Sequence, residues 1–570
     1  MHFFSRLASM VLVLLCATQS AAKEDPADQV FTGGKVYTLD SSTPWAEAVA
    51  IRGDTIVYVG SDAGADAFID ADTQRYDLSG KLLLPGFIDG HIHVGSTLPY
   101  LFAATLNPTM TPAEALATIA KHAEDYPDQN PLLGAGFLGA AFGPGGPTAE
   151  DLDSVVSDRP VIIFDEGFHS AWVNTMAMDM VGLTADTPDP KPGAHFYRRY
   201  PNGSPTGWLI EGEAFGWIAE ELGVIDIEIL DRSADVFLAS MSSMGITAAF
   251  DAGMIEGDGA LFSFMGKRAE DGKLPLRILG SHYVNSDRGL ATALDDLERL
   301  SKAHEHEFFD VEVLKISLDG TVEAQTAYTI DPYLEPPGHR AEPLVSLENT
   351  KKVVAAAAEK KIDMHLHAIG DGAVRMALDL VEYARKEHPQ STSRFTICHA
   401  QLVNPTDVPR FGELDVMVQS TPTWYAYDDI VLAYLGEERL THMYPLNSIA
   451  AAGGKVTLGS DFPASWIGLD GMNPVFNIEM ALTRQPPGDK DYIPQPPVNE
   501  RITLEQAIRG YTIDAAYQLG LEDEIGSITP GKQADMVVLD QDLFSLDPYA
   551  IHKTKVVLTI VDGKVVFEAP

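Results

Sequence analysis

The sequence predicts an α/β protein, a (β/α)8 barrel of the TIM type with a small β-sandwich domain formed from both chain ends. Two observations favour this fold. The central part of the chain alternates helical stretches with short apolar strands, as parallel βα units do, and polar or ionisable residues recur where those strands end. Short β-branched runs occupy both ends of the chain. A length of 570 residues exceeds one usual hydrophobic core, so a second, smaller domain is expected.

The N-terminus is typical of a cleaved secretory signal peptide. Arg6 precedes an apolar run at residues 7–17, and small residues follow at positions 20–22. We therefore expect residues 1–22 to be removed and the product to be periplasmic or secreted. No later segment is apolar for long enough to span a bilayer, so no stable membrane anchor is expected. Removal of Cys16 leaves Cys398 without a second cysteine, which excludes an intramolecular disulfide.

The two ends of the mature chain, residues 23–85 and 516–570, are expected to form the two parts of the β-sandwich. Short apolar alternations in the first part are broken by turn residues such as Gly53. In the second part, Asp562–Gly563 lies between two β-branched runs, which is a strong hairpin signal. A domain built from both parts would bring the chain ends together.

Residues 86–515 are expected to form the barrel. A helix-forming stretch at 350–361 is followed by a strand at 362–367, and this pattern recurs. In a closed barrel the carboxyl ends of the strands converge on one face. A doubly wound open sheet is the alternative. It would need a glycine-rich phosphate-binding turn after its first strand, and residues 85–91 do not form one.

The charge balance excludes some partners. The chain has 40 basic and 82 acidic residues, a formal net charge of −42. Nucleic acid and anionic membrane surfaces are therefore not expected as partners. A small molecule is the expected partner, and a homo-oligomer is left open.

His91 and His93 are the first candidate metal ligands. They stand two residues apart at the end of an expected strand, where period-two alternation sends both side chains to one face. Two imidazoles on one face can share a cation, whereas a single histidine is more often structural.

The segment that contains this pair, Pro85 to His93, resembles the signature of the amidohydrolase superfamily, and residues 526–535 resemble the family's closing segment. The interior is similar to amidohydrolase family 3, the YtcJ-like proteins that include N-substituted formamide deformylase. The similar segments are residues 169–174, 315–320, 367–371, 399–401 and 459–463. The resemblance implies a metal-bearing barrel with a β-sandwich companion that hydrolyses an amide-like bond.

The resemblance also implies further ligands. His367 and His399 are expected to join the metal site, which would hold one or two divalent ions, with zinc the expected metal. An ammonium beside a divalent cation is unfavourable, whereas a lysine carboxylated by carbon dioxide would be an anionic bridge between two metals. We therefore expect N6-carboxylysine at Lys315, and the alternative is a salt-bridged barrel lysine.

Asp461 is expected to be both a metal ligand and the proton carrier. A metal lowers the pKa of a bound water from about 16 towards roughly 7, and a nearby carboxylate can accept the released proton. The same carboxyl can then deliver the proton to the departing nitrogen. The alternative is a plain turn aspartate.

Residues beside the metal site are expected to contact the substrate. His169, Trp172, Asn174 and Asp319 are the candidates, with Glu211 a weaker one, and structural packing is the alternative for each. The family usually has one histidine where this chain has His365 and His367, so His365 is left out of the ligand set.

Cys398 is expected to face away from the metal. Strand alternation points it opposite to His399, which indicates a small buried hydrophobic residue rather than a nucleophile.

These residues together predict a metal-dependent hydrolase that cleaves a carbon–nitrogen bond other than a peptide bond. A deaminase or a cyclic-amide hydrolase would use the same metal apparatus on an amidine or a ring. A non-catalytic periplasmic binding or scaffold protein is the rival from another class, and it predicts little bound metal.

Overall fold

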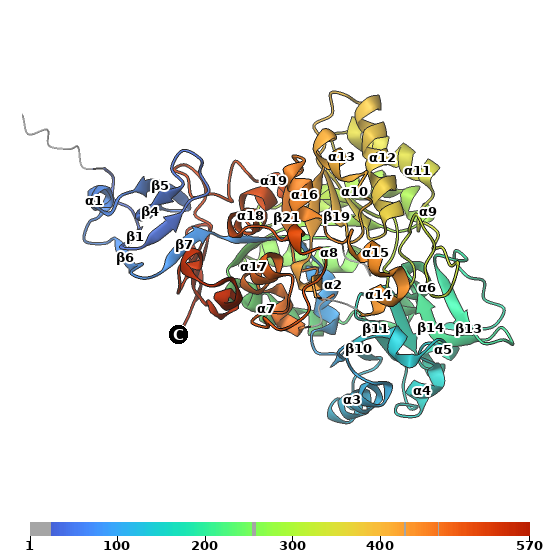
Figure 1. The fold of residues 1–570 in the computed structure, drawn as a ribbon. Coiled ribbons are helices and arrows are strands. Elements are labelled where there is room, and N and C mark those ends of the chain that lie inside the picture. Colours follow the sequence, from blue (N-terminus) through green and yellow to red (C-terminus); the bar gives the residue numbers. More distant parts are fainter. Residues whose placement is uncertain (1–23, 254–257, 427–428, 465–466) are drawn as a thin grey trace, which may run out of the picture.

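The computed structural model describes residues 24–253, 258–426, 429–464 and 467–570 (Figure 1). The expected signal peptide lies outside these residues. Within the described part of the chain, we find no helix that is both long and apolar enough to cross a membrane.

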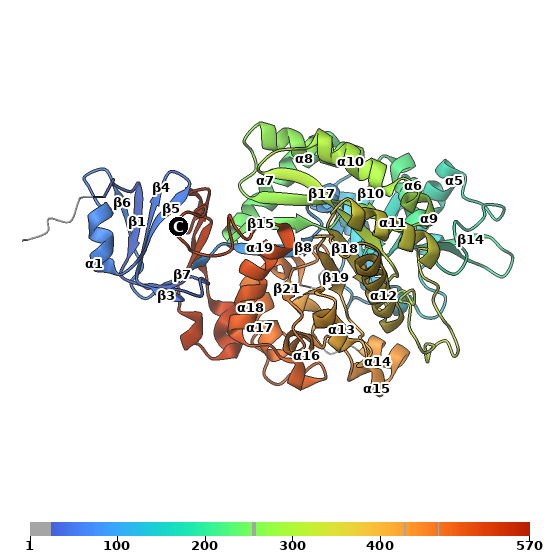
Figure 2. The same cartoon turned by 90° about the horizontal axis from the view of Figure 1, so that it is seen from above.

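The barrel is an eight-stranded sheet in which each strand pairs in parallel with the next (Figure 2). The predicted α/β barrel is confirmed. Its strands are β8 (Phe87–Ile92), β15 (Ile246–Asp251), β16 (Arg277–Val284), β17 (Phe309–Ser317), β18 (Met364–Ala368), β19 (Phe395–His399), β20 (Met417–Ser420) and β21 (Val456–Leu458).

The first and last barrel strands are joined just beyond their carboxyl ends. The Asp461 N–H donates to the His91 carbonyl at 2.7 Å, and the His93 N–H donates to the Phe462 carbonyl at 2.9 Å. These two hydrogen bonds close the barrel at the edge where the candidate ligands lie.

Helices surround the barrel because each has one apolar face to bury. In α12, for example, Leu378, Leu380 and Val381 are fully buried against the sheet. The helix predicted over 350–361 is α11, which begins slightly earlier. The longer covering helices are α7 (Ile227–Ser243), α8 (Asp258–Glu270), α10 (Ala293–Ala303), α11 (Leu347–Glu359), α12 (Asp371–Glu387) and α17 (Pro474–Thr483). Shorter ones are α2 (Val94–Thr97), α9 (Asp287–Leu290), α13 (Val408–Glu413), α14 (Asp429–Leu435), α15 (Glu437–Leu440), α16 (Leu446–Ala451), α18 (Leu504–Gly510) and α19 (Ile513–Leu519).

A small β domain lies at one end of the molecule and contains strands from both chain ends (Figures 1 and 2). One sheet has the order β5-β4-β1-β6, and the other has the order β24-β23-β22-β7-β2-β3. Phe31, Val49 and Val538 share a buried cluster between them. The strands are β1 (Gln29–Thr32), β2 (Lys35–Tyr37), β3 (Trp45–Ala46), β4 (Ala48–Arg52), β5 (Thr55–Gly60), β6 (Gln74–Asp77), β7 (Leu82–Pro85), β22 (Met536–Leu539), β23 (Val556–Val561) and β24 (Lys564–Glu568), with the short helix α1 (Asp62–Ala65) beside β4.

The boundary expected between residues 515 and 516 falls inside a helix. That helix, α19, packs on the barrel, where Ala515 and Ala516 share a buried cluster with Ile88 of β8. The C-terminal part of the sandwich begins instead at β22, so the barrel unit extends beyond residue 515.

A further sheet is inserted between β8 and β15, and the sequence reasoning did not separate it from the barrel. It mixes parallel and antiparallel pairs in the order β13-β14-β12-β11-β10-β9. Its elements are β9 (Ala104–Thr105), β10 (Leu132–Phe137), β11 (Val161–Asp165), β12 (Ser170–Val173), β13 (Phe196–Arg199) and β14 (Pro205–Ile210), with α3 (Pro112–Asp125), α4 (Ala149–Asp153), α5 (Thr175–Val181) and α6 (Gly212–Leu222). Figure 1 shows this sheet beside the barrel.

Candidate metal centre

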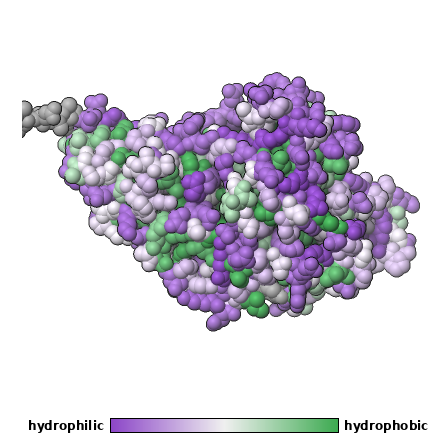
Figure 3. Space-filling view, turned by 45° about the horizontal axis from the view of Figure 1, so that its top comes forward, coloured by the Kyte–Doolittle hydropathy of each residue, from purple (hydrophilic) through white to green (hydrophobic). Residues whose placement is uncertain are grey.

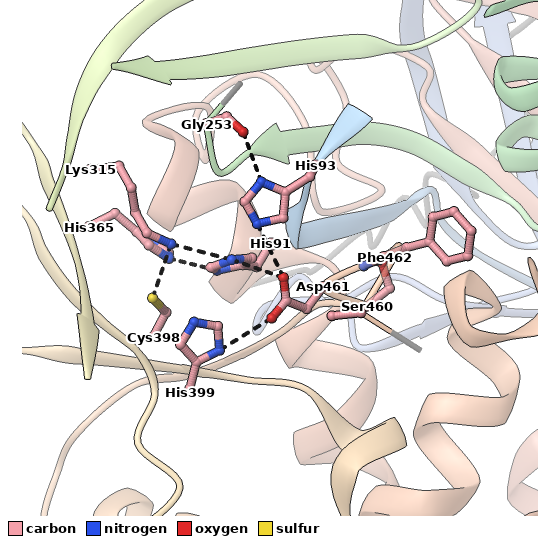
Figure 4. Close-up of polar contacts among 12 residues, drawn as sticks. His91, His93, Gly253, Lys315, His365, Cys398, His399, Ser460, Asp461 and Phe462 are labelled. Atoms are coloured by element: carbon pink, nitrogen blue, oxygen red, sulfur yellow. Dashed lines mark hydrogen bonds and ion pairs between the residues drawn. The ribbon is translucent and has the colours of Figure 1, made fainter. Parts of the chain in front are cut away.

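The two histidines at the end of β8 converge on one carboxylate. Asp461 Oδ1 lies 3.4 Å from His91 Nε2 and 3.3 Å from His93 Nε2 (Figure 4). The side chains of His91, His93 and Asp461 bring their ligand atoms within 4.8 Å of one another. As predicted from their spacing in the sequence, the two histidine rings lie on the same side of the strand.

Asp461 is held in place by the backbone around it. Its φ is +50°, an uncommon value for a residue with a side chain, and its N–H bonds to the His91 carbonyl. Asp89 supports the same junction, because its carboxyl accepts the N–H groups of His91 at 3.1 Å and Ser460 at 3.0 Å. Sequence reasoning assigned no role to Asp89, although it lies inside the motif.

His399 and His367 complete the cluster from the ends of β19 and β18. Their ring centroids are 4.4 Å apart, and His399 Nδ1 lies 3.5 Å from Asp461 Oδ2. His399 is buried, and among the described residues neither of its ring nitrogens has a hydrogen-bond partner. A buried polar group without a partner costs about 1–3 kcal/mol, so these nitrogens fit a cation that lies among the rings.

The protonation states favour metal binding. Burial, as the main cause, lowers the pKa values of His91, His367 and His399 well below the usual range of histidine. These rings are therefore neutral near pH 7, and a neutral imidazole is the form that coordinates a metal.

Lys315, at the end of β17, points into the cluster. Its Nζ lies 3.3 Å from His91 Nε2 and 3.4 Å from Cys398 Sγ, and the residue is buried. Among the described residues, no carboxylate forms an ion pair with this ammonium within 4.0 Å. The structure therefore gives no support to a salt-bridged lysine, which was the alternative interpretation.

Cys398 faces the cluster, and the expectation that it points away is wrong. It is buried as expected, but its sulfur approaches Lys315, and its ligand atom groups with those of His91 and His399. Positive φ values at His399 (+69°) and Ala400 (+42°) end the regular alternation of β19, so Cys398 and His399 both face inwards. Burial raises the pKa of the thiol to about 12, so it stays protonated.

His365 stands directly behind His91. Its Nε2 lies 3.0 Å from His91 Nδ1, the ring nitrogen that does not face Asp461. It packs against the ring of Phe250, with centroids 4.6 Å apart. Sequence reasoning left His365 out of the ligand set, and the structure gives it a place behind a ligand. The sequence did indicate that His365 lies on the same side of the strand as His367, because the two residues stand two apart.

Comparison with known proteins identifies the family of the chain. A family model described as amidohydrolase family matches residues 74–567 of the chain. The chain belongs to the amidohydrolase family. The resemblance drawn from its motifs is therefore confirmed across most of its length.

Individual relatives agree over nearly the full length of this amidohydrolase. N-substituted formamide deformylase of Arthrobacter pascens is 26% identical over 559 residues, 95% of this chain and 98% of the relative. The putative amidohydrolase YtcJ of Bacillus subtilis (strain 168) is 26% identical over 547 residues, 95% and 99%. Among solved structures, an uncharacterised metal-dependent hydrolase of Pyrococcus horikoshii OT3 aligns with a TM-score of 0.71 at 20% identity, covering 91% of this chain and 99% of its own.

His169 reaches the metal centre of the amidohydrolase from the inserted sheet. Its ring centroid lies 5.3 Å from that of His367, and its Nδ1 lies 2.8 Å from Glu211 Oε2. The other Glu211 oxygen accepts a hydrogen bond from Thr326 Oγ1 at 2.6 Å. Burial opposes protonation of His169, but the charge and hydrogen bond of Glu211, together with the charges of Asp165 and Asp461, outweigh it and raise the pKa to about 9. The structure thus places a cationic ring at the cavity wall.

Trp172 and Asn174 do not reach the amidohydrolase cavity, so their expected substrate contact is not supported. Trp172 packs between Phe137 and Phe142, with ring centroids 5.7 and 5.0 Å away. Asn174 caps α5, where its Oδ1 accepts the Ala177 N–H at 2.9 Å. Both are fully buried. A tryptophan and an asparagine in a motif can serve the core and a helix end as well as a ligand.

Asp319 is also structural. It is fully buried and accepts the N–H groups of Tyr328, Ile369 and Gly370 at 2.8–2.9 Å. Its Oδ1 lies 3.7 Å from His367 Nε2. Burial raises the pKa of this carboxyl to about 7, against the effect of the three N–H donors. Asp319 therefore supports the segment around His367 and does not line the cavity.

A cavity of about 730 Å³ opens above the metal centre of the amidohydrolase. Its wall includes all four candidate metal-binding histidines, Lys315, His169 and Asp461. Phe168 lies in the inserted sheet region and Phe215 in the helix α6 that follows it. Trp424 and Tyr492 follow β20 and α17 of the barrel. The cavity is large enough for a small organic substrate.

Proposed function

We propose that this amidohydrolase cleaves a carbon–nitrogen bond, other than a peptide bond, in a small amide-like substrate. The observation that carries the proposal is the position of Asp461 among the imidazoles of His91, His93 and His399, at 3.3–3.5 Å from each, beneath the cavity. Family membership supports a hydrolase, and the name of the Arthrobacter pascens relative supports an amide-like substrate.

The donor atoms fit one or two divalent cations, and we propose zinc. His91, His93, His367 and His399 would provide nitrogen, and Asp461 would provide oxygen, a set that zinc accepts readily. When bound, the cation supplies an activated water and polarises the carbonyl of the substrate. Lys315, lying among these donors, is proposed to be carboxylated and to act as an anionic bridge.

The side chains of this protein then transfer the proton that the attacking water releases. Asp461 accepts a proton from the attacking water at one of its carboxylate oxygens and delivers it to the departing nitrogen. His169, oriented by Glu211, is positioned at the wall to donate a hydrogen bond to the substrate oxygen. Because His169 Nδ1 is occupied by Glu211, its Nε2 is the nitrogen left for this contact.

The test is turnover by the Asp461→Asn variant. A panel of N-substituted formamides, cyclic amides and aminopurines identifies a true substrate and separates amide hydrolysis from the rival deaminase and cyclic-amide hydrolase. On that substrate we expect a loss of kcat of about 10²- to 10⁴-fold, with the variant still folded. The matched control is Asp379→Asn, which changes an exposed carboxylate on α12.

Two outcomes would count against the proposal. Full turnover by Asp461→Asn would remove the proposed proton carrier. Purified protein that holds less than one metal ion per chain, and that turns over no member of the panel after loading with zinc, would favour the non-catalytic binding protein instead.

We also propose that the protein is exported, on the pattern at residues 1–22. N-terminal sequencing of the protein from separated cell fractions checks this. A mature N-terminus near residue 23 in the periplasm or the medium supports export, and an intact N-terminus in the cytoplasm contradicts it.

A further inference from the structure

We propose that the cavity selects amides whose nitrogen substituent is neutral or cationic and apolar or aromatic in its body, and that it disfavours substrates with a carboxylate. This inference rests on the proposed hydrolysis of a carbon–nitrogen bond. It concerns the outer wall of the cavity rather than the metal centre.

The outer wall is lined by carboxylates. Glu166 and Glu323 are half-buried, while Asp429 and Asp489 are exposed at the wall. Among the described residues that line the cavity, none is an arginine, and Lys315 is the one lysine. A substrate carboxylate in a buried site is normally held by an arginine fork or a lysine, because an unpaired buried charge is strongly unfavourable.

Neither basic side chain of the wall is left for a carboxylate at the far end of the substrate. Lys315 lies beside His91 at the metal centre, where we propose that it is carboxylated, and His169 is held by Glu211 at 2.8 Å, with its Nε2 proposed to contact the substrate oxygen. A carboxylate at the far end of the substrate would therefore face Glu166, Glu323, Asp429 and Asp489 with no free cation among the described lining residues. Like charges repel, and the half-buried positions of Glu166 and Glu323 reduce the screening of that repulsion by water.

Aromatic side chains provide the rest of the wall. Trp424 is fixed on both sides, since its ring stacks on His399 with centroids 5.2 Å apart and its Nε1 donates to the Ala464 carbonyl at 2.9 Å. Phe168, Phe215 and Tyr492 also face the cavity. Aromatic faces bind apolar and aromatic groups, and next to carboxylates they also favour cations.

The position of Asp489 is defined by its own loop. Its Oδ1 accepts the N–H groups of Asp491 and Tyr492, both at 3.1 Å. The carboxylate of Asp489, beside Tyr492, is thus held at the cavity by a turn and does not rotate freely. The net charge of −42 also disfavours substrates with a carboxylate, because at long range it slows the approach of anions.

The test uses three substrates that share one reacting group. They are N-benzylformamide and its derivatives with a 4-aminomethyl or a 4-carboxy group. We expect kcat/KM for the neutral and cationic members to exceed that of the carboxylate member by at least about tenfold at low salt. The difference should shrink in high salt, where charges are screened.

The variants Glu323→Gln and Asp489→Asn test the residues themselves. We expect each to narrow the ratio of kcat/KM between the neutral and the carboxylate substrates. The control Asp379→Asn changes an exposed residue of α12 that does not line the cavity, and it should leave that ratio unchanged.

The outcomes separate this inference from the proposed function. Equal or faster turnover of the carboxylate member overturns the inference and leaves amide hydrolysis standing. If the zinc-loaded enzyme turns over none of the three, the proposed function fails for this class, and calorimetric binding of the same compounds to Asp461→Asn decides the inference. Tightest binding of the carboxylate member, or binding of none, overturns it.

Discussion

His91 and His365 contact each other through their ring nitrogens, with 3.0 Å between His91 Nδ1 and His365 Nε2. If His91 offers its Nε2 lone pair to a metal, its proton lies on Nδ1 and is donated to His365. His93 uses a backbone group in the same way, since its Nδ1 lies 2.8 Å from the Gly253 carbonyl. Such partners fix the orientation and the tautomer of a ligand.

We therefore expect His365→Leu to weaken metal binding by about 10- to 100-fold, since loss of a ligand's hydrogen-bond partner has effects of this size. His365→Gln, which keeps an acceptor, should lose less. Competition of the purified variants with a chelator measures the affinity. Equal affinity in the leucine variant and the unchanged protein would show that His365 is only a packing residue.

Carboxylation of Lys315 predicts a carbon signal that depends on that lysine. After incubation with ¹³C-bicarbonate and zinc, the protein should show a carbamate resonance in NMR, and Lys315→Met should lack it. The exposed Lys302→Met is the control that keeps the resonance. Metal content should fall in Lys315→Met, because an anionic bridge is lost. An identical spectrum from the Lys315→Met variant would contradict carboxylation of Lys315.

Asn174→Ala should reduce stability without changing catalysis. The side chain caps α5 and also bonds to the Val161 N–H at 3.1 Å, so its loss leaves buried backbone groups unpaired. We expect a cost of about 1–3 kcal/mol, seen as a lower thermal midpoint. His169→Asn should behave oppositely, with reduced kcat/KM. A reduced kcat/KM in a folded Asn174→Ala protein would restore its role in substrate contact.

The metal-free protein should lose stability as the pH falls below about 6.5. Burial lowers the pKa values of His91, His365, His367 and His399 below the ordinary value of 6.5. The unfolded chain therefore binds more protons than the folded chain below that pH, and stability that is present above it is lost. Thermal midpoints of chelator-treated protein across pH 5–8 measure this.

The His365→Leu variant gives the control for that pH series. With one buried histidine fewer, its loss of stability should be shallower. Because the raised pKa values of Asp89 and Asp319 act in the opposite direction, the difference between the two proteins is the test. An equally steep pH dependence in the His365→Leu variant and the unchanged protein would contradict a neutral buried ring at His365.

Most residues of the candidate metal centre could be predicted from their positions at the ends of strands. A parallel barrel brings the carboxyl ends of its strands together. The residues that stand at or near such ends are His91, Lys315, His367, His399 and Asp461. That argument needs only period-two alternation and the parallel arrangement, both of which the sequence pattern carries.

The errors arose where local backbone departs from that pattern. The positive φ at His399 turns Cys398 inwards. A left-handed backbone conformation is not predictable from sequence when the residue is not glycine. Trp172 and Asn174 belong to the inserted sheet, whose short apolar strands have the same composition as barrel strands. Only the antiparallel pairing of β11, β12 and β14 distinguishes them, and pairing depends on contacts between distant residues.

The antiparallel pairing of β7 with β22 has a consequence for the synthesis of the protein. Leu82 pairs with Leu539, so the partner of β7 leaves the ribosome about 450 residues later. At about 5–20 residues per second, β22 is synthesised roughly 20 to 90 s after β7. A chain that ends early cannot complete this sheet and keeps an apolar strand edge exposed, which invites aggregation or proteolysis. The small domain can therefore be completed only after nearly the whole chain has been synthesised.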